Sequence, residues 1–369
     1  MESKKLRIGI TQGDPNGIGY EVILKAFSDP EMFDLCTPII YGSPKVAAYH
    51  KKTLNLNVNF NTVESTQQIQ DGRLNLINCY NEDIQITIGK PSVEGGKTAF
   101  ECLERAVRDY KDNELDAIVT APINKKTIQN EAFQFPGHTE YFASCFSDDA
   151  EPLMILMNDK LRVALVTTHL PLKDVAQAVT SEAITRKLEI FDNSLKSDFY
   201  IDNPRIAVLS LNPHAGDGGL LGTEEQEIIA PAIKAMFDKG ILCFGPYPAD
   251  GFFGAGLYDR FDGILAMYHD QGLAPFKALA MDDGVNFTAG LPLVRTSPDH
   301  GTAYDIAGKN LASPDSFRHA IYAAIDIVRH RSQYTRDNAN PLRRQYIEKQ
   351  QGDTSKLNLT DDETTTPKA

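Results

Sequence analysis

Short runs of apolar and β-branched residues alternate along this chain with longer amphipathic stretches, such as 98–114 and 223–240. A helix repeats its apolar positions about every 3.6 residues, whereas a strand buried on both faces is apolar throughout. Strands and helices in alternation are typical of α/β proteins with largely parallel sheets. The expected strands are residues 6–11, 37–42, 74–78, 117–122, 162–168, 206–212 and 263–268.

The length of the chain limits its domain organisation. With 369 residues it exceeds the size at which one hydrophobic core usually stops growing, so we expect two domains. From about residue 338 the sequence is polar and charged, and this composition predicts a disordered tail over 338–369.

Composition excludes several classes of function. A net charge of −13 argues against a nucleic-acid surface, since such surfaces are rich in Lys and Arg. No apolar stretch approaches the roughly 18 to 20 residues of a transmembrane helix, and the N-terminus does not resemble a signal peptide. Five cysteines without a CxxC pair are typical of free thiols in a reducing compartment. We therefore expect a cytoplasmic protein that binds neither nucleic acid nor membrane.

Three histidines follow three of the expected strands directly: His169, His214 and His269. The carboxyl ends of parallel strands lie along one edge of the sheet, which is where α/β proteins bind ligands. Three imidazoles at that edge can converge on one divalent cation and leave coordination positions open for a substrate. A single histidine after a strand is more often a turn residue or a hydrogen-bonded core group, so the shared placement of all three carries the metal hypothesis.

A glycine-rich stretch, TQGDPNGIGYEV, follows the first expected strand and leads into a helix. Gly13, Gly17 and Gly19 would let backbone amides approach an anion at the helix N-terminus. The spacing matches neither GxGxxG nor GxxxxGK[ST]. A tight turn between strand and helix explains the stretch as well as an anion site does.

Further polar residues stand out in two later stretches. His138 and Thr139 open another expected helix, where an anion is favoured but a simple capping role for Thr139 is equally consistent. Lys277, Asn286 and Arg295 are isolated polar residues within an apolar context. Lys and Arg are suited to binding phosphate or carboxylate, although single cations are most often solvated at the surface.

Taken in order, nine blocks of the sequence resemble those of the 4-hydroxythreonine-4-phosphate dehydrogenase family. The resemblance runs from about residue 6 to residue 335, and the number of ordered blocks makes it specific. The blocks are TQGDPNGIG, TAPINK, PGHTE, TTHLPL, LNPHAGDGG, GTEE, MYHDQGL, GVNFTAGLP and RTSPDHGTA.

The resemblance implies an activity and an architecture. Members of the family oxidise the secondary hydroxyl of 4-phosphooxy-L-threonine with NAD or NADP, and loss of carbon dioxide then gives 3-amino-2-oxopropyl phosphate, a precursor of pyridoxal phosphate. They are homodimers in which both subunits complete each site. Their fold is like that of isocitrate and isopropylmalate dehydrogenases, with two α/β/α domains and the active site in the cleft between them. Applied to this chain, it predicts one domain over 1–130 and 296–337, and a second over 131–295.

The resemblance also assigns roles to individual residues. The metal ligands of the family fall on His169, His214 and His269, the three histidines already chosen from strand ends. Zinc, cobalt and magnesium are the candidate ions. The substrate contacts fall on His138, Thr139, Lys277, Asn286 and Arg295, and the expected catalytic groups are Asp250, Asp270 and Lys277.

Three alternatives remain open at this point. A sister dehydrogenase would act on threonate or erythronate 4-phosphate with the same metal ligands. A metal-dependent phosphate-ester hydrolase would use the same histidines without a nicotinamide cofactor. A metabolite-binding protein would use them without turnover.

Overall fold

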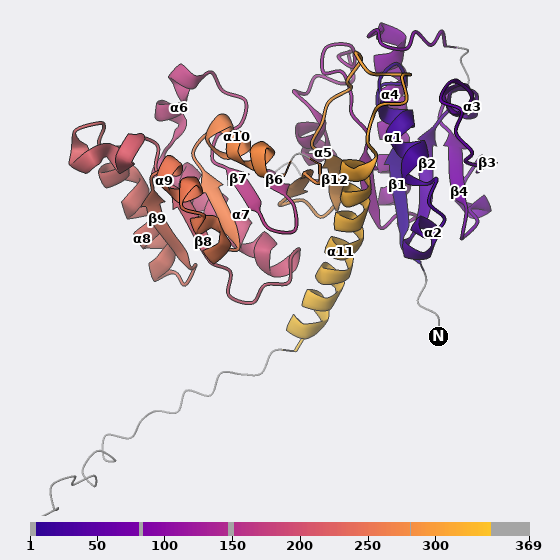
Figure 1. Ribbon diagram of the computed structural model, residues 1–369. Coiled ribbons are helices and arrows are strands. Elements are labelled where there is room, and N and C mark those ends of the chain that lie inside the picture. Colours follow the sequence, from indigo (N-terminus) through magenta and orange to yellow (C-terminus); the bar gives the residue numbers. More distant parts are fainter. Residues whose placement is uncertain (1–4, 81–83, 147–150, 281, 341–369) are drawn as a thin grey trace, which may run out of the picture.

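The structure, a computed structural model, describes residues 5–80, 84–146, 151–280 and 282–340. Its strands form one twelve-stranded sheet flanked by helices (Figure 1). Of the tail predicted over 338–369, residues 341–369 lie outside the described residues. Within the described ranges, no helix has the length and apolar content needed to cross a membrane.

All seven strands predicted from the sequence are present. They are β1 (Arg7–Thr11), β2 (Thr37–Gly42), β4 (Leu74–Asn78), β5 (Ala117–Thr120), β7 (Arg162–Leu165), β8 (Ile206–Leu209) and β10 (Gly263–Ala266). Five further strands were not predicted. They are β3 (Phe60–Val63), β6 (Leu153–Met157), β9 (Cys243–Tyr247), β11 (Val285–Ala289) and β12 (Arg295–Pro298).

Both amphipathic stretches are helical. The stretch 98–114 lies mostly in α4, and 223–240 contains a short π-helix, Glu225–Ile229, followed by α8. The α-helices are α1 (Gly19–Ala26), α2 (Met32–Leu35), α3 (Pro44–Thr53), α4 (Val93–Lys111), α5 (His138–Phe146), α6 (Leu172–Ala178), α7 (Ser181–Ser197), α8 (Ala230–Asp238), α9 (Ala249–Gly254), α10 (His269–Leu279) and α11 (Asp315–Asn338).

The sheet has two halves that meet at its centre. Its order is β3-β4-β2-β1-β5-β12-β11-β6-β7-β10-β8-β9. The first six strands pair in parallel with one another, whereas β11 pairs antiparallel with both β12 and β6. The chain returns from the second half to the first at β12, which α11 then covers. The sheet order thus groups the strands as the predicted domains do, although the domain boundaries themselves stay a prediction.

Both faces of the second half of the sheet are buried. Successive residues of β7, β8 and β10 belong alternately to two apolar clusters: Val163 and Leu165 lie in one, and Ala164 between them lies in the other. Side chains of a strand alternate between the two faces of its sheet, so each cluster marks one covered face. The helices α7 and α10 pack on these strands. This is the layered α/β/α arrangement that the sequence predicts.

Three of the parallel strands are neighbours: β10 lies between β7 and β8 and pairs in parallel with both. Their carboxyl ends therefore share one edge. His169, His214 and His269 follow these three strands in turn, so the fold carries all three histidines to the same edge of the sheet.

The amino end of α4 approaches the segment that follows β5 very closely. Ser92 caps this helix by accepting a hydrogen bond from the Gly95 amide at 3.0 Å. A Cβ atom at Gly96 would lie 2.0 Å from the carbonyl oxygen of Thr127. Only glycine fits here, and its absence of a side chain sets the spacing between the helix and residues 124–128.

This close approach generates a stability prediction. Gly96→Ala should lower the free energy of unfolding by about 2 kcal/mol, because the new methyl group collides with backbone that cannot move aside cheaply. Denaturant titration measures the change. Gly251→Ala is the matched control, since Gly251 also lies in a helix but a Cβ there meets no atom within 4 Å; it should leave stability unchanged or slightly raised. Equal effects of both variants would contradict the packing explanation.

Candidate active site

Four of the predicted substrate contacts line one cavity of about 200 Å³ at the centre of the sheet. They come from four different elements: α5, α10, β11 and β12. Residues of the two halves of the sheet thus share this cavity. The four are His138, Lys277, Asn286 and Arg295.

Arg295 is a buried cation. It opens β12, is only 3% exposed, and donates to the hydroxyl of Thr120 at 2.7 Å and to that of Thr288 at 3.3 Å. Burial lowers the pKa of Arg295 to about 9, and the nearby charge of Glu140 opposes this shift. Among the described residues no carboxylate forms an ion pair with it. A guanidinium still protonated at neutral pH and short of a counter-ion is suited to binding an anionic ligand.

His138 and Thr139 start α5, beside Arg295. The Nε2 atom of His138 is buried and lacks a hydrogen-bond partner within the described structure. Burial lowers the pKa of His138 well below its usual value, and the charges of Arg295 and Lys125 act in the same direction. The ring is therefore neutral at pH 7. Thr139 reaches this network less directly, with its hydroxyl 3.5 Å from that of Thr288.

Lys277 and Asn286 complete the predicted set. Lys277 lies in the last turn of α10, and its ammonium is 3.3 Å from the carboxylate of Asp299. The Oδ1 atom of Asn286 is buried without a partner within the described structure. Unpartnered buried polar atoms are rare in proteins, and three in one small cavity, on His138, Asn286 and His300, indicate a ligand that supplies the missing hydrogen bonds.

Sequence reasoning missed two further residues of the cavity, Asp299 and His300. Both follow β12, a strand that was not predicted. His300 donates from Nδ1 to the carbonyl of Gly301 at 3.1 Å, and its Nε2 is buried without a partner in the described structure. The RTSPDHGTA block contained both residues, but its polar composition gave no signal that distinguishes their roles.

Two of the three candidate metal ligands lie close together. The ring centroids of His169 and His269 are 6.0 Å apart. Burial lowers the pKa of His169, with contributions in the same direction from Lys125 and His269. A neutral imidazole is the form that binds a metal. Both rings are accessible from outside the protein: His169 is exposed, and the side chain of His269 is 40% exposed.

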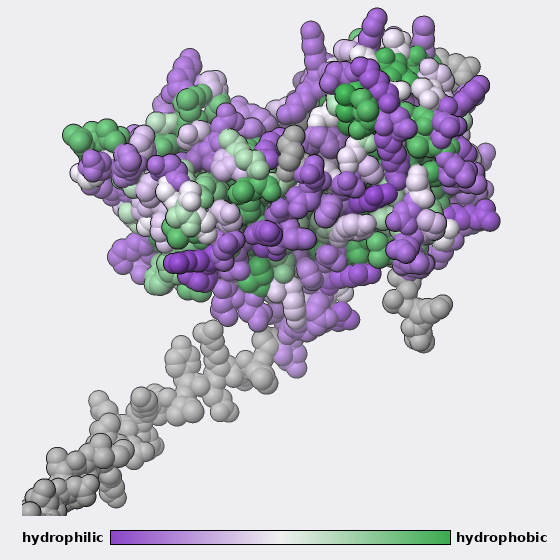
Figure 2. Space-filling model, in the orientation of Figure 1, coloured by the Kyte–Doolittle hydropathy of each residue, from purple (hydrophilic) through white to green (hydrophobic). Residues whose placement is uncertain are grey.

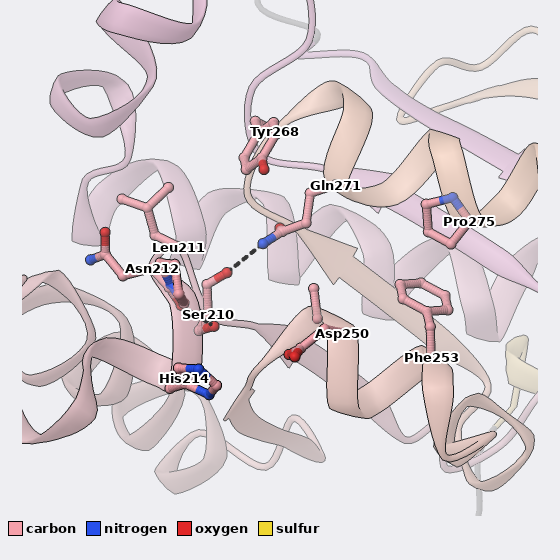
Figure 3. Close-up of a pocket in the computed structure, with 11 residues that line it drawn as sticks. Ser210, Leu211, Asn212, His214, Asp250, Phe253, Tyr268, Gln271 and Pro275 are labelled. Carbon is pink, nitrogen blue, oxygen red and sulfur yellow. Dashed lines mark hydrogen bonds between the residues drawn. The ribbon is translucent and has the colours of Figure 1, made fainter. Parts of the chain in front are cut away.

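His214 lies apart from this pair, in a neighbouring cavity of about 540 Å³ that it lines with Asp250 (Figure 3). Residues 214–218 all have positive φ angles, so the short segment Pro213–Gly219 after β8 is a series of left-handed turns. Gln271 donates to the Ser210 carbonyl at 2.6 Å and joins the end of β8 to α10. Among the described residues no three His, Cys, Asp or Glu side chains are grouped closely enough to hold a metal.

The two predicted catalytic acids have different surroundings. Asp250 belongs to the first turn of α9 and lines the cavity of His214. Asp270 is 86% exposed, and its Oδ1 is 2.7 Å from Nδ1 of His269. That contact leaves Nε2 of His269 free to bind a ligand, as in metal sites where a carboxylate orients the histidine. The catalytic roles of both acids stay predictions.

The glycine-rich stretch after β1 is a tight turn. The Asp14 amide donates to the Pro122 carbonyl, the Asn16 amide to the Asp14 carboxylate, and the Ile18 amide to the Thr302 carbonyl. These amides are already bonded within the protein. The turn therefore connects β1 to the neighbouring loops, and these three amides are not available to an anion.

The arrangement has a definite chemical character. One cation is buried without a counter-ion, a second lies at the same cavity and pairs with Asp299, and neutral polar groups of His138 and Asn286 lie beside them. Such a cavity binds a small ligand that is anionic and also donates hydrogen bonds. The exposed histidine pair lies on a neighbouring element, since His269 begins the helix that carries Lys277.

Comparisons with known proteins identify similar sequences and similar folds. A crystal structure of 4-hydroxythreonine-4-phosphate dehydrogenase from Klebsiella pneumoniae superposes with a TM-score of 0.77, at 33% identity, over 89% of this chain and 99% of that one. A protein of Bacteroides thetaiotaomicron with the same name is 62% identical over 97% of this chain and 98% of its own length. A relative from Oceanobacillus iheyensis, provisionally named D-threonate 4-phosphate dehydrogenase, is 39% identical over 88% of this chain and 99% of its own.

A family model described as pyridoxal phosphate biosynthetic protein PdxA matches residues 34–324. These residues include every predicted site residue from His138 to Arg295. The match covers most of the chain, and the close relative covers nearly all of it. The chain belongs to the PdxA family.

Proposed function

We propose that this protein oxidises 4-hydroxythreonine 4-phosphate with NAD or NADP and releases carbon dioxide to give 3-amino-2-oxopropyl phosphate. The observation that carries the proposal is the buried, unpaired guanidinium of Arg295 in a cavity that His138, Lys277 and Asn286 also line. The substrate has a phosphate and a carboxylate, which such a cavity would bind. The names of the close relatives support the choice of substrate.

The residues of this chain would bind and orient the substrate. Arg295 and Lys277 would hold its anionic groups, and the neutral ring of His138 would accept or donate one hydrogen bond without adding charge. Fixing both ends of a short molecule aligns its secondary hydroxyl, which lowers the entropic part of the barrier. We place the cleft between two domains, 1–130 with 296–337 and 131–295.

The three histidines fit a divalent cation such as zinc, cobalt or magnesium. The donors are imidazoles, and the contact between Asp270 and His269 would fix the orientation of one ring. When bound, the cation would lower the pKa of the substrate hydroxyl and stabilise negative charge during decarboxylation. The nicotinamide cofactor would take up the hydride. The amides of Asp14, Gly17 and Ile18, in the turn after β1, are already bonded within the protein and are not free to bind its phosphates.

We propose further that the protein is a homodimer whose subunits complete each metal site together. His169 and His269 form a pair in one chain, and the exposed His214 would complete the site of the other chain. The surface next to these histidines is apolar: Leu172 and Leu220 are 72% and 78% exposed, and Leu170 and Leu221 are also exposed. Figure 2 shows hydrophobic residues on the two projecting ends of this half, over α6 and before α8. Large exposed apolar groups of this kind indicate an interface.

The cellular setting follows from the cysteines. All five carry free thiols, which suits a reducing compartment. We therefore propose a cytoplasmic enzyme.

A sister activity on D-threonate 4-phosphate is the second candidate, because a relative of similar length has that name. The two substrates differ at the carbon next to the carboxylate, which bears an amino group in one and a hydroxyl in the other. Both are anionic at both ends, so Arg295 and Lys277 do not discriminate between them.

The assay that tests this function is formation of NADH or NADPH at 340 nm by metal-reconstituted protein. We expect turnover of 4-hydroxythreonine 4-phosphate that a chelator abolishes, since the metal is needed to activate the hydroxyl. A preference for D-threonate 4-phosphate would support the sister activity. Release of inorganic phosphate without a change at 340 nm would contradict both and indicate a hydrolase.

Arg295→Met should separate binding from stability. Methionine has a similar length but no charge, so the substrate KM should rise at least about 100-fold while the KM for the nicotinamide cofactor changes little. Removing a buried cation without a counter-ion should leave the thermal midpoint of the ligand-free protein unchanged or higher. Scanning calorimetry and steady-state kinetics measure the two effects. A lower midpoint with an unchanged substrate KM would show that Arg295 has only a structural role.

The shared metal site predicts that dimerisation and metal binding are linked. Leu220→Asp with Leu221→Asp should give monomers in sedimentation velocity and weaken zinc binding at least about tenfold, although every histidine is retained. Val93→Asp alters an equally exposed residue elsewhere and should stay dimeric. His214→Ala should remain dimeric and lose zinc. Monomers that bind zinc as tightly as the wild type would exclude a shared site.

A further inference from the structure

A carboxylate in an anion-binding cavity requires an explanation. Asp299 lines the same cavity as Arg295 and Lys277. Its negative charge would repel a phosphate or carboxylate ligand, and its burial raises its pKa and so carries a cost of its own. A group with two such disadvantages must contribute something else to the site.

Asp299 forms an ion pair with Lys277. The two charged groups are 3.3 Å apart, and the Lys277 side chain is 48% exposed whereas that of Asp299 is only 17% exposed. An exposed lysine has four rotatable bonds and loses side-chain entropy when it is held in one place. The partner that is better buried is therefore the one that fixes the position of the other.

The backbone around Asp299 is itself well anchored. Its amide lies 3.2 Å from the carbonyl of Gly284 and 3.3 Å from the hydroxyl of Ser316. Ser316 donates in turn to the Gly284 carbonyl at 2.7 Å and is buried. The end of β12, the start of α11 and the residue before β11 therefore meet at one point, and Asp299 projects from it.

The ion pair also joins two parts of the site. Lys277 lies on α10, which begins with His269, whereas Asp299 lies at the end of β12, which begins with Arg295. Among the described residues, Lys277 has no ion-pair partner other than Asp299.

We propose that Asp299 is a positioning residue for Lys277: the ion pair holds the lysine ammonium at the cavity, at a set distance from Arg295, where it meets an anionic group of the substrate. The inference rests on the proposed function, in which Lys277 contacts the substrate. Asp299 need not touch the substrate itself. The repulsion between Asp299 and an anionic substrate is offset, because Lys277 is already held in place and no longer loses side-chain entropy when the substrate binds.

A double-mutant cycle tests the inference. We expect Lys277→Ala to lower kcat/KM about 100-fold and Asp299→Asn about tenfold, whereas the double variant should lose no more than Lys277→Ala alone, because Asp299 acts through the lysine. Losses that multiply to about 1000-fold in the double variant would overturn the proposal. They would mean that Asp299 acts independently of Lys277.

Two further variants separate positioning from folding. Asp299→Glu keeps the charge and should restore kcat/KM to within about threefold of the wild type, since the half-exposed lysine can adjust to the longer side chain. Asp283→Asn is the matched control, because Asp283 accepts from Asn158 at 3.2 Å and does not pair with Lys277. It should leave kcat/KM unchanged. A Glu variant as impaired as the Asn variant would overturn the proposal.

A binding measurement makes the outcome independent of turnover. The same cycle is measured by calorimetry with inorganic phosphate as the probe, on the full chain, with thermal midpoints recorded for each variant. Non-additive losses of phosphate affinity support the inference even if the wild type oxidises neither substrate, in which case only the proposed function fails. Additive losses, or a wild type that binds no phosphate, would overturn the inference.

Discussion

The burial of the Arg295 guanidinium is the constraint on which the site depends. A charge this deep in a protein is costly unless its hydrogen bonds are satisfied. Two hydroxyls on the neighbouring strands accept hydrogen bonds from the guanidinium: those of Thr120 on β5 and Thr288 on β11. These hydroxyls accept hydrogen bonds but carry no negative charge, so among the described residues only the nearby charge of Glu140 opposes that of Arg295. A guanidinium in this position is suited to a small, anionic ligand.

The same requirement explains the unusual composition of β12. Its four residues, RTSP, are all buried, and the strand lies at the centre of the sheet between β5 and β11. Polar residues and proline are disfavoured in central strands. Here Arg295 donates to the two threonine hydroxyls named above, and the Thr296 hydroxyl donates to the Ala320 carbonyl at 2.7 Å. The cavity at the centre of the sheet thus comes at a cost in intrinsic strand preference.

This composition also marks where sequence reasoning succeeds and where it stops. Apolar runs such as IAVL in β8 are readily predicted as strands, because a strand that is buried on both faces consists of apolar residues. From these runs the sequence predicts parallel strands with three histidines at one edge of the sheet. In the structure β7, β10 and β8 do pair in parallel. The strand β12 was missed because its polar residues read as a loop. Asp299 and His300, which follow that strand, could not be placed for the same reason. The distance between His214 and the other two histidines depends on left-handed turns that residue pattern does not encode.

The candidate site has two ends, one around Arg295 and one around the histidines. They differ in how completely a single chain forms them. The end around Arg295 is lined by strands and helices of the same chain, so its charged groups are in place once that chain has folded. The histidine end is open, with His169 and His214 exposed and leucines around them exposed as well. An exposed imidazole binds a metal weakly because its ring is free to move and water competes. In a site divided in this way, residues of one chain would bind the anionic substrate. The metal site would form only when two chains associate.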